Sequence, residues 1–132
     1  MSPEIYWLTL TAVMTGLMWA PYILNRIAVR GLFGALANPS PEDKAHSGWA
    51  VRAHAAHMNA VENLVVFGAV VLAGHAAGAL TETTALAAMI YFWVRLAHFV
   101  VYTFGIPFAR TLTFAAGMLC QLAIGLTVLG VM

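Results

Sequence analysis

Charge is what this sequence has least of. Asp, Glu, Lys and Arg make up 8% of its 132 residues, whereas 62% are hydrophobic and the mean hydropathy is +0.86. A soluble domain of this length needs far more charge on its surface, so the composition excludes a soluble globular protein. The formal net charge is only +1, and no nucleic-acid partner is expected.

Cysteine and an N-terminal basic region are also scarce or missing. Cys120 is the single cysteine, so no intrachain disulfide can form, and its apolar neighbours indicate a packing role. The first apolar run is preceded by the acidic residue Glu4 and by no Lys or Arg. A secretory signal peptide is therefore not predicted, and we expect this run to be retained as a helix.

Four apolar stretches are present, each close to the ~20 residues that a helix needs to cross a bilayer. They cover residues 5–24, 51–74, 84–102 and 112–132. Residues 25–50 contain two prolines and five of the eleven charged residues, which is typical of a loop. The sequence predicts an all-α integral membrane protein, a four-transmembrane-helix bundle that forms one domain over residues 1–132.

The six Lys and Arg residues predict the orientation. Arg26, Arg30, Lys44 and Arg52 flank the first loop, Arg110 lies beside the third, and the second loop has none. Because basic residues collect on the cytoplasmic side, we expect the first and third loops there and both termini on the other side. A bacterial-type inner membrane, or its equivalent, is the expected location.

Polar residues are concentrated at the start of the second stretch, in the segment RAHAAHMNAVEN (52–63). At about 100° per residue, Asn59 and Asn63 fall within about 20° of Arg52 on a helix, and Glu62 lies about 80° away. Glu62 is also ~15 Å along the helix from Arg52, well inside the membrane. A carboxylate at that depth needs a partner.

The third stretch offers one. Arg95 lies in its middle, and His98 and Tyr102 follow at i+3 and i+7 on the same face. We predict an intramembrane ion pair between Glu62 and Arg95. The alternative interpretation is that such a pair only holds the bundle together. In the fourth stretch, Gln121 is expected to form an interhelical hydrogen bond.

The predicted site has a formal charge of +2 and several hydrogen-bonding groups near the cytoplasmic surface. It consists of Arg52, Asn59, Glu62, Arg95, His98, Tyr102, Arg110 and Thr111. Arginine binds carboxylates with a rigid pair of donors, so the cluster favours a small anionic ligand. An apolar surround at bilayer depth would admit a lipophilic second substrate.

Three motifs carry a resemblance to a known family. RAHAAHMNAVEN, RLAHFVVY and ARTLTF, in this order, resemble the MAPEG superfamily, membrane-associated proteins in eicosanoid and glutathione metabolism. Asn59 and Glu62 match the N-x-x-E of that family. The remaining matches, to R-x-x-H/Y-x-x-x-Y and to a following Arg with Ser or Thr, are Arg95, His98, Tyr102, Arg110 and Thr111.

The resemblance implies a homotrimer that binds glutathione between subunits on the cytoplasmic side. The residues that would bind glutathione are Arg52, Asn59, Glu62, Arg95, His98 and Tyr102. Arg110 or Thr111 would stabilise the thiolate, which attacks a lipophilic electrophile or a peroxide in the membrane. The implied activity is that of a glutathione-dependent transferase or peroxidase of the microsomal type.

The sequence departs from the family pattern at three positions. Ala55 stands where glutathione-using members commonly have Arg, and Met58 stands where one branch has another Arg. Phe114 replaces a Tyr of the prostaglandin synthase branch, so that activity is not expected.

Two other functions are compatible with the residues. His54, His57, His98 and Glu62 include ligand types of divalent metals, and His54 and His57 share the i, i+3 spacing. Their helix face, however, is about 140–200° from that of Arg52. The other alternative is a non-enzymatic bundle that binds lipid or a protein partner and retains its polar cluster for assembly.

Overall fold

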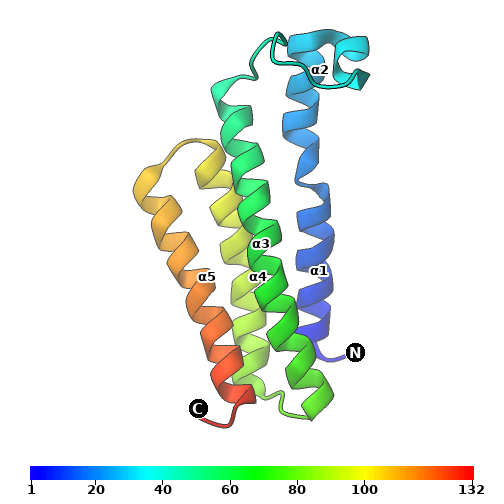
Figure 1. The fold of residues 1–132 in the computed structure, drawn as a ribbon. Coiled ribbons are helices and arrows are strands. Elements are labelled where there is room, and N and C mark those ends of the chain that lie inside the picture. Colours follow the sequence, from blue (N-terminus) through cyan, green and yellow to red (C-terminus); the bar gives the residue numbers. More distant parts are fainter.

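A computed structural model of the protein describes all 132 residues as five helices (Figure 1). They are α1 (Pro3–Leu17), α2 (Trp19–Leu36), α3 (Gly48–Ala77), α4 (Glu82–Thr103) and α5 (Pro107–Val128). Because α2 continues α1, the helices form four segments that are long and apolar enough to cross a membrane. Both termini lie at the end of the bundle opposite the long loop. The prediction of an all-α protein with four spans is confirmed.

The two largest differences from the predicted boundaries are at the first loop and at the start of the last helix. The expected loop at 25–50 is helical as far as Leu36, so the irregular segment is residues 37–47. The last helix begins at Pro107 instead of residue 112. Proline is tolerated in the first turn of a helix, because the N–H groups of that turn have no partner within the helix and the missing one costs nothing. In both places the helix extends beyond the apolar run from which the boundary was predicted.

Proline also explains the break between α1 and α2. Pro21 has no N–H for the carbonyl of Leu17, the last residue of α1, and the chain turns at Met18 before α2 begins. Farther along, the Asn25 amide donates to the Ser47 hydroxyl at 2.9 Å and accepts from the Ser47 N–H at 3.1 Å. This reciprocal pair attaches α2 to the start of α3.

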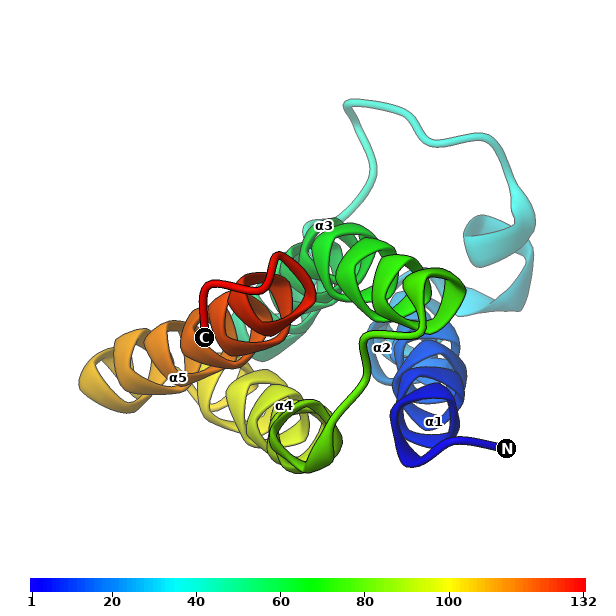
Figure 2. The same cartoon turned by 90° about the horizontal axis from the view of Figure 1, so that it is seen from below.

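The apolar core lies where α3, α4 and α5 meet. The rings of Phe67 and Tyr91 stack with centroids 3.9 Å apart, and Val71 and Ile124 pack fully buried in the same cluster. Viewed along the bundle, α1 and α5 lie on opposite sides of α3 and α4 (Figure 2). Many large apolar side chains are exposed on the spans. Such a surface requires lipid around it, as expected for a multi-pass membrane protein.

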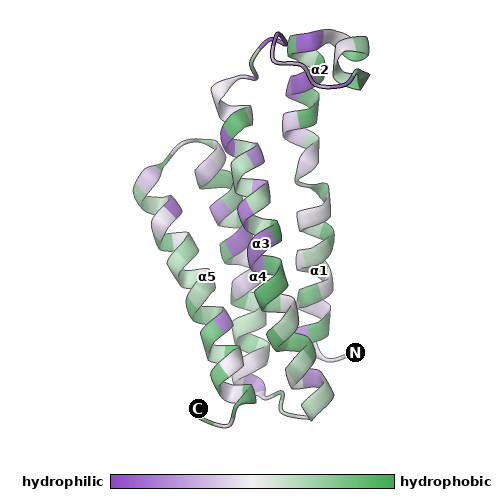
Figure 3. Cartoon of the chain, in the orientation of Figure 1, coloured by the Kyte–Doolittle hydropathy of each residue, from purple (hydrophilic) through white to green (hydrophobic).

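The hydrophilic residues of α3 and α4 are concentrated in the half of the bundle toward the long loop (Figure 3). At the opposite end, Thr81 and Thr84 form a capping box at the start of α4. The Thr84 hydroxyl also donates to the buried carboxyl of Glu4 at 3.0 Å. The first turn of α1 is thereby joined to the first turn of α4.

Candidate functional site between α3, α4 and α5

A polar pocket of about 160 Å³ opens among α3, α4 and α5. Its walls are Asn59, His98, Tyr102, Arg110, Thr111 and Phe114. Five of these six residues are predicted site residues, drawn from three helices. The motif spacing along each helix therefore brings the side chains of the three motifs to one place.

Arg95 lies beneath this pocket and is only 2% exposed. Its guanidinium donates to the Asn59 amide oxygen at 2.5 Å, and its Nε has no hydrogen-bond partner. The one ion pair in the structure is elsewhere, between Arg30 and Asp43. The positive charge of Arg95 therefore meets no carboxylate in this chain.

The predicted Glu62–Arg95 ion pair is consequently wrong for the single chain. Glu62 is exposed on the outer surface of α3, while Asn59 and Asn63 point toward the neighbouring helices. Helix geometry explains the difference, because Glu62 is about 60° from Asn59 and 100° from Asn63. Amides are also cheaper to bury than a carboxylate.

An amide network continues from Asn59 toward the core. The Asn63 amide nitrogen donates to the Asn59 backbone oxygen at 2.9 Å. The Gln121 amide nitrogen lies 3.2 Å from the Asn63 carbonyl and 3.3 Å from the Tyr91 hydroxyl. Gln121 thus forms the predicted interhelical hydrogen bonds, and the network fixes the floor of the pocket across α3, α4 and α5.

The pocket rim combines aromatic and cationic groups. The His98 and Tyr102 rings meet edge to face with centroids 5.5 Å apart, and the Arg110 guanidinium carbon is 4.9 Å from the Tyr102 ring centroid. This contact holds the Arg110 cation over the pocket mouth. His98 is 2% exposed and its Nδ1 has no partner. Arg110 and Thr111 are exposed.

Arg52, which is predicted to bind the ligand, does not line this pocket. Its Nε donates at 3.0 Å to the carbonyl of Thr103, the last residue of α4. Gly105 has a φ of 75°, and a Cβ there would lie 3.1 Å from the Arg52 Nε. The cation therefore packs on the carboxyl end of α4, where the helix dipole stabilises it, and supports the turn that leads to Arg110.

The histidines of the alternative metal site are not brought together. The His57 Nδ1 is 2.8 Å from the Tyr22 hydroxyl, and the His54 ring packs edge to face on Tyr22. Both therefore face α2, whereas His98 faces the pocket. No group of three His, Cys, Asp or Glu side chains is close enough to hold a metal.

A larger cavity, of about 380 Å³, lies between the α1–α2 segment and α4 but has a different character. Its lining includes Val13, Met14, Phe92 and Leu96 and is almost entirely hydrophobic. It contains no group that could activate or orient a polar ligand. We therefore place the candidate chemistry in the smaller polar pocket.

Phe114 and the amide network were not among the predicted site residues. Phe114 is one turn beyond Arg110 on α5, so its place in the wall follows from i, i+4 spacing once Arg110 is placed. Asn63 and Gln121 lie deeper, and the sequence gives no sign that they bond to each other.

The fold and this pocket define the class: a multi-pass α-helical membrane protein with a polar, cationic pocket inside its bundle. A family model described as the MAPEG family matches residues 5–130. The chain therefore belongs to the MAPEG family, whose membership indicates a role related to glutathione or eicosanoid metabolism. A comparison with curated proteins finds no match.

Proposed function

We propose that this protein is a glutathione-dependent transferase or peroxidase that acts on lipophilic electrophiles in the membrane. The observation that carries the proposal is the polar pocket, in which two cations and no carboxylate surround a space lined by hydrogen-bonding groups. Arg95 places an unneutralised charge beneath Asn59, and Arg110 places a second one at the mouth. Such a site attracts an anion.

The thiolate of glutathione is the anion that the proposed reaction requires. Lowering the pKa of a thiol by about two units takes roughly 2.7 kcal/mol of preferential thiolate stabilisation. The Arg110 guanidinium, with the Thr111 hydroxyl next to it, can supply this in a partly dry site. The sulfur then attacks the electrophilic centre of the lipophilic substrate and displaces its leaving group.

A cavity of about 160 Å³ is small for a complete tripeptide, since ligand pockets commonly measure about 300–1,000 Å³. We propose that a neighbouring subunit completes the site in a homotrimer. Glu62 supports this, because it is exposed on the outer face of α3 at bilayer depth, where a bare carboxylate is costly. Covered by a second copy, Glu62 would bind the ammonium group of glutathione.

The residues then divide into two groups. Asn59, Glu62, His98 and Tyr102 would contact glutathione, while Arg95 and Arg52 would act by charge and by positioning. The lipophilic substrate would enter from the surrounding lipid, and the pocket would open toward the cytoplasm of a bacterial-type inner membrane, with both termini on the other side.

A second candidate is a non-enzymatic bundle that binds lipid or a protein partner. Ala55 and Met58 favour it, because neither supplies the cation that glutathione-using relatives carry nearby. Turnover distinguishes the two functions: an enzyme conjugates glutathione to a generic aryl halide in detergent solution, and a binding module does not.

Glutathione-binding calorimetry on the detergent-solubilised protein tests the proposed site. Arg110→Ala and Glu62→Gln are expected to weaken binding at least about tenfold each, because each removes one charged contact worth about 1.4 kcal/mol or more. Glu82→Gln is the matched control, since Glu82 lies at the other end of the bundle. Unchanged affinity in both site variants, with the fold preserved, would remove glutathione from the proposal.

A further inference from the structure

The end of α2 turns sharply away from the bundle axis at Gly31. This residue has φ 73° and ψ 166°, a conformation that glycine adopts far more readily than other residues. After the turn, the chain is strongly apolar, and its large side chains have no cover. Leu32, Phe33 and Leu36 are 56%, 85% and 75% exposed.

This segment, residues 31–36, lies beyond the outline of the four spans. In the view along the bundle axis, the cyan end of α2 projects sideways past α1 (Figure 2). In the side view it lies crosswise at the top of the α1–α2 segment (Figure 1). Because the apolar spans require lipid around them, a segment that projects past them at this end lies over the surrounding bilayer.

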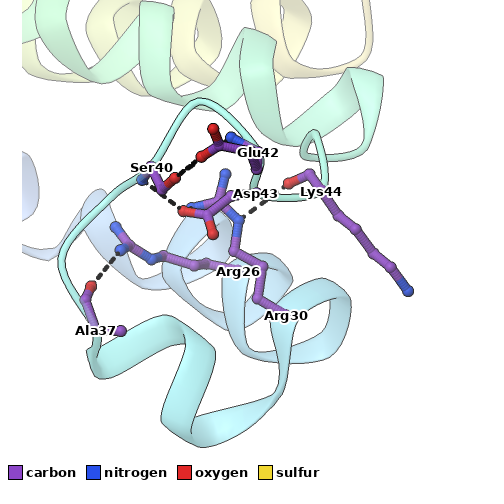
Figure 4. Close-up of polar contacts among 7 residues, drawn as sticks. All are labelled: Arg26, Arg30, Ala37, Ser40, Glu42, Asp43 and Lys44. Atoms are coloured by element: carbon purple, nitrogen blue, oxygen red, sulfur yellow. Dashed lines mark hydrogen bonds and ion pairs between the residues drawn. The ribbon is translucent and has the colours of Figure 1, made fainter.

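Hydrogen bonds to the loop hold the segment in this bent position. The Arg26 guanidinium donates to the Ala37 carbonyl at 3.2 Å, and the Arg30 Nε donates to the Lys44 carbonyl at 3.0 Å (Figure 4). Arg30 also pairs with Asp43 at 3.4 Å. These contacts tie both the beginning and the end of the loop to α2. They fix residues 31–36 next to the loop end of the first span.

Three cations and two carboxylates lie around the segment, which gives it a net charge of +1. The Asp43 carboxylate pairs with Arg30, and the Glu42 carboxylate bonds to the Ser40 hydroxyl. Arg26 bonds to a carbonyl, which leaves its charge in place. Lys44 has no ion-pair partner, and its side chain extends away from the loop. Only Arg30 is neutralised by a carboxylate in contact with it. Apolar side chains next to free cations complement a surface that is apolar below and anionic above.

We propose that residues 31–36 form an interfacial anchor on anionic phospholipid at the loop side of the membrane. Leu32, Phe33 and Leu36 enter the boundary between headgroups and acyl chains, and Arg26 and Lys44 lie at the level of the lipid phosphates. The anchor fixes how deeply the loop end of the bundle sits in the bilayer. It is independent of the proposed reaction with glutathione.

Lipid-depth quenching in vesicles tests the anchor. In a Cys120→Ala background, an environment-sensitive fluorophore is attached at Phe33→Cys and, as the matched control, at the exposed loop position Asn38→Cys. The vesicles contain phosphatidylcholine with phosphatidylserine, and one lipid carries a nitroxide. We expect quenching at position 33 to exceed that at position 38 by about twofold or more, because only position 33 enters the lipid.

Two further variants sharpen the result. Gly31→Ala disfavours the turn and is expected to lower the quenching at position 33 toward the control value. Lys44→Gln is expected to reduce the preference for nitroxide on phosphatidylserine over nitroxide on phosphatidylcholine. Equal quenching at positions 33 and 38 would overturn the proposal. A fluorophore at 33 shielded from both lipid and water-soluble quenchers would overturn it too, because a second protein copy would then cover the segment.

Discussion

The two halves of the bundle treat buried polar groups in opposite ways. Toward the termini, the carboxyl of Glu4 accepts from Thr84, and the capping box closes the start of α4. Toward the long loop, five buried polar atoms have no partner, among them the Arg95 Nε and the His98 Nδ1. Buried polar groups in proteins are nearly always paired, so unpaired ones call for an explanation. The terminal half pairs its buried polar groups, whereas the loop half leaves several unpaired, and the proposed ligand would explain those of Arg95 and His98.

The strongest test of this contrast is Arg95→Met. The substitution removes the buried charge and puts an unbranched apolar side chain in its place. We expect glutathione affinity to fall about 100-fold, equivalent to about 2.7 kcal/mol. The free energy of unfolding should stay unchanged or rise, because replacing a buried charge by a hydrophobic residue is often neutral or stabilising. Calorimetry and detergent unfolding followed by circular dichroism measure the two quantities.

Arg95→Lys is the control for this variant, since it keeps the charge while changing the geometry. It should retain more affinity than Arg95→Met. If Arg95→Met binds glutathione as wild type does, the buried charge has no part in ligand binding and the contrast between the halves is only structural.

Thr84→Val makes the converse change in the terminal half. It leaves the Glu4 carboxyl without a donor and the Thr81 N–H without its cap, so the free energy of unfolding should fall by about 2 kcal/mol. Glutathione affinity should not change. Thr83→Val, at an exposed neighbouring position, is the control and should leave both quantities alone. A loss of affinity in Thr84→Val would show that the two halves are coupled.

The contrast also separates what the sequence predicts from what it does not. Hydrophobic length predicts the four spans, and i, i+4 spacing predicts that His98 and Tyr102 share one face of α4. Arg110 is on another helix, and only the family resemblance places it with them. Periodicity gives only relative angles, so it does not indicate whether Asn59 or Glu62 faces the neighbouring helices. Packing decides in favour of Asn59, which together with Asn63 can be satisfied by amide hydrogen bonds.

Arg52 illustrates a second limit. Its charge and position suggested a ligand contact, yet it bonds to a carbonyl of α4 that becomes free only because the helix ends at Thr103. A helix end is poorly determined by composition, so this contact was not predictable from the sequence. The charged residues of this chain therefore serve two purposes, and only the structure separates them.

A smaller effect is expected from Arg52→Gln, which removes the cation from the end of α4. The free energy of unfolding should fall by about 1 kcal/mol, through the lost hydrogen bond and the lost interaction with the helix dipole. Because the adjoining turn leads to Arg110, the pKa of bound glutathione thiol should also rise, which the ultraviolet absorbance of the thiolate reports. A stability loss without a change in thiolate absorbance would limit Arg52 to a structural role.

The smallest expected effect concerns His46, another unpartnered group of the loop half. Burial, followed by the charges of Arg30 and Arg26, holds the pKa of this imidazole below its usual value of 6.5. The unfolded loop therefore binds a proton more readily than the folded loop does, so the stability of the loop is constant above about pH 6.5 and falls as the pH drops below it. Hydrogen exchange of residues 37–47 should accelerate below that pH, once the intrinsic pH dependence is subtracted. His46→Asn should abolish the acceleration, and an identical pH profile in this variant would show that another group causes it.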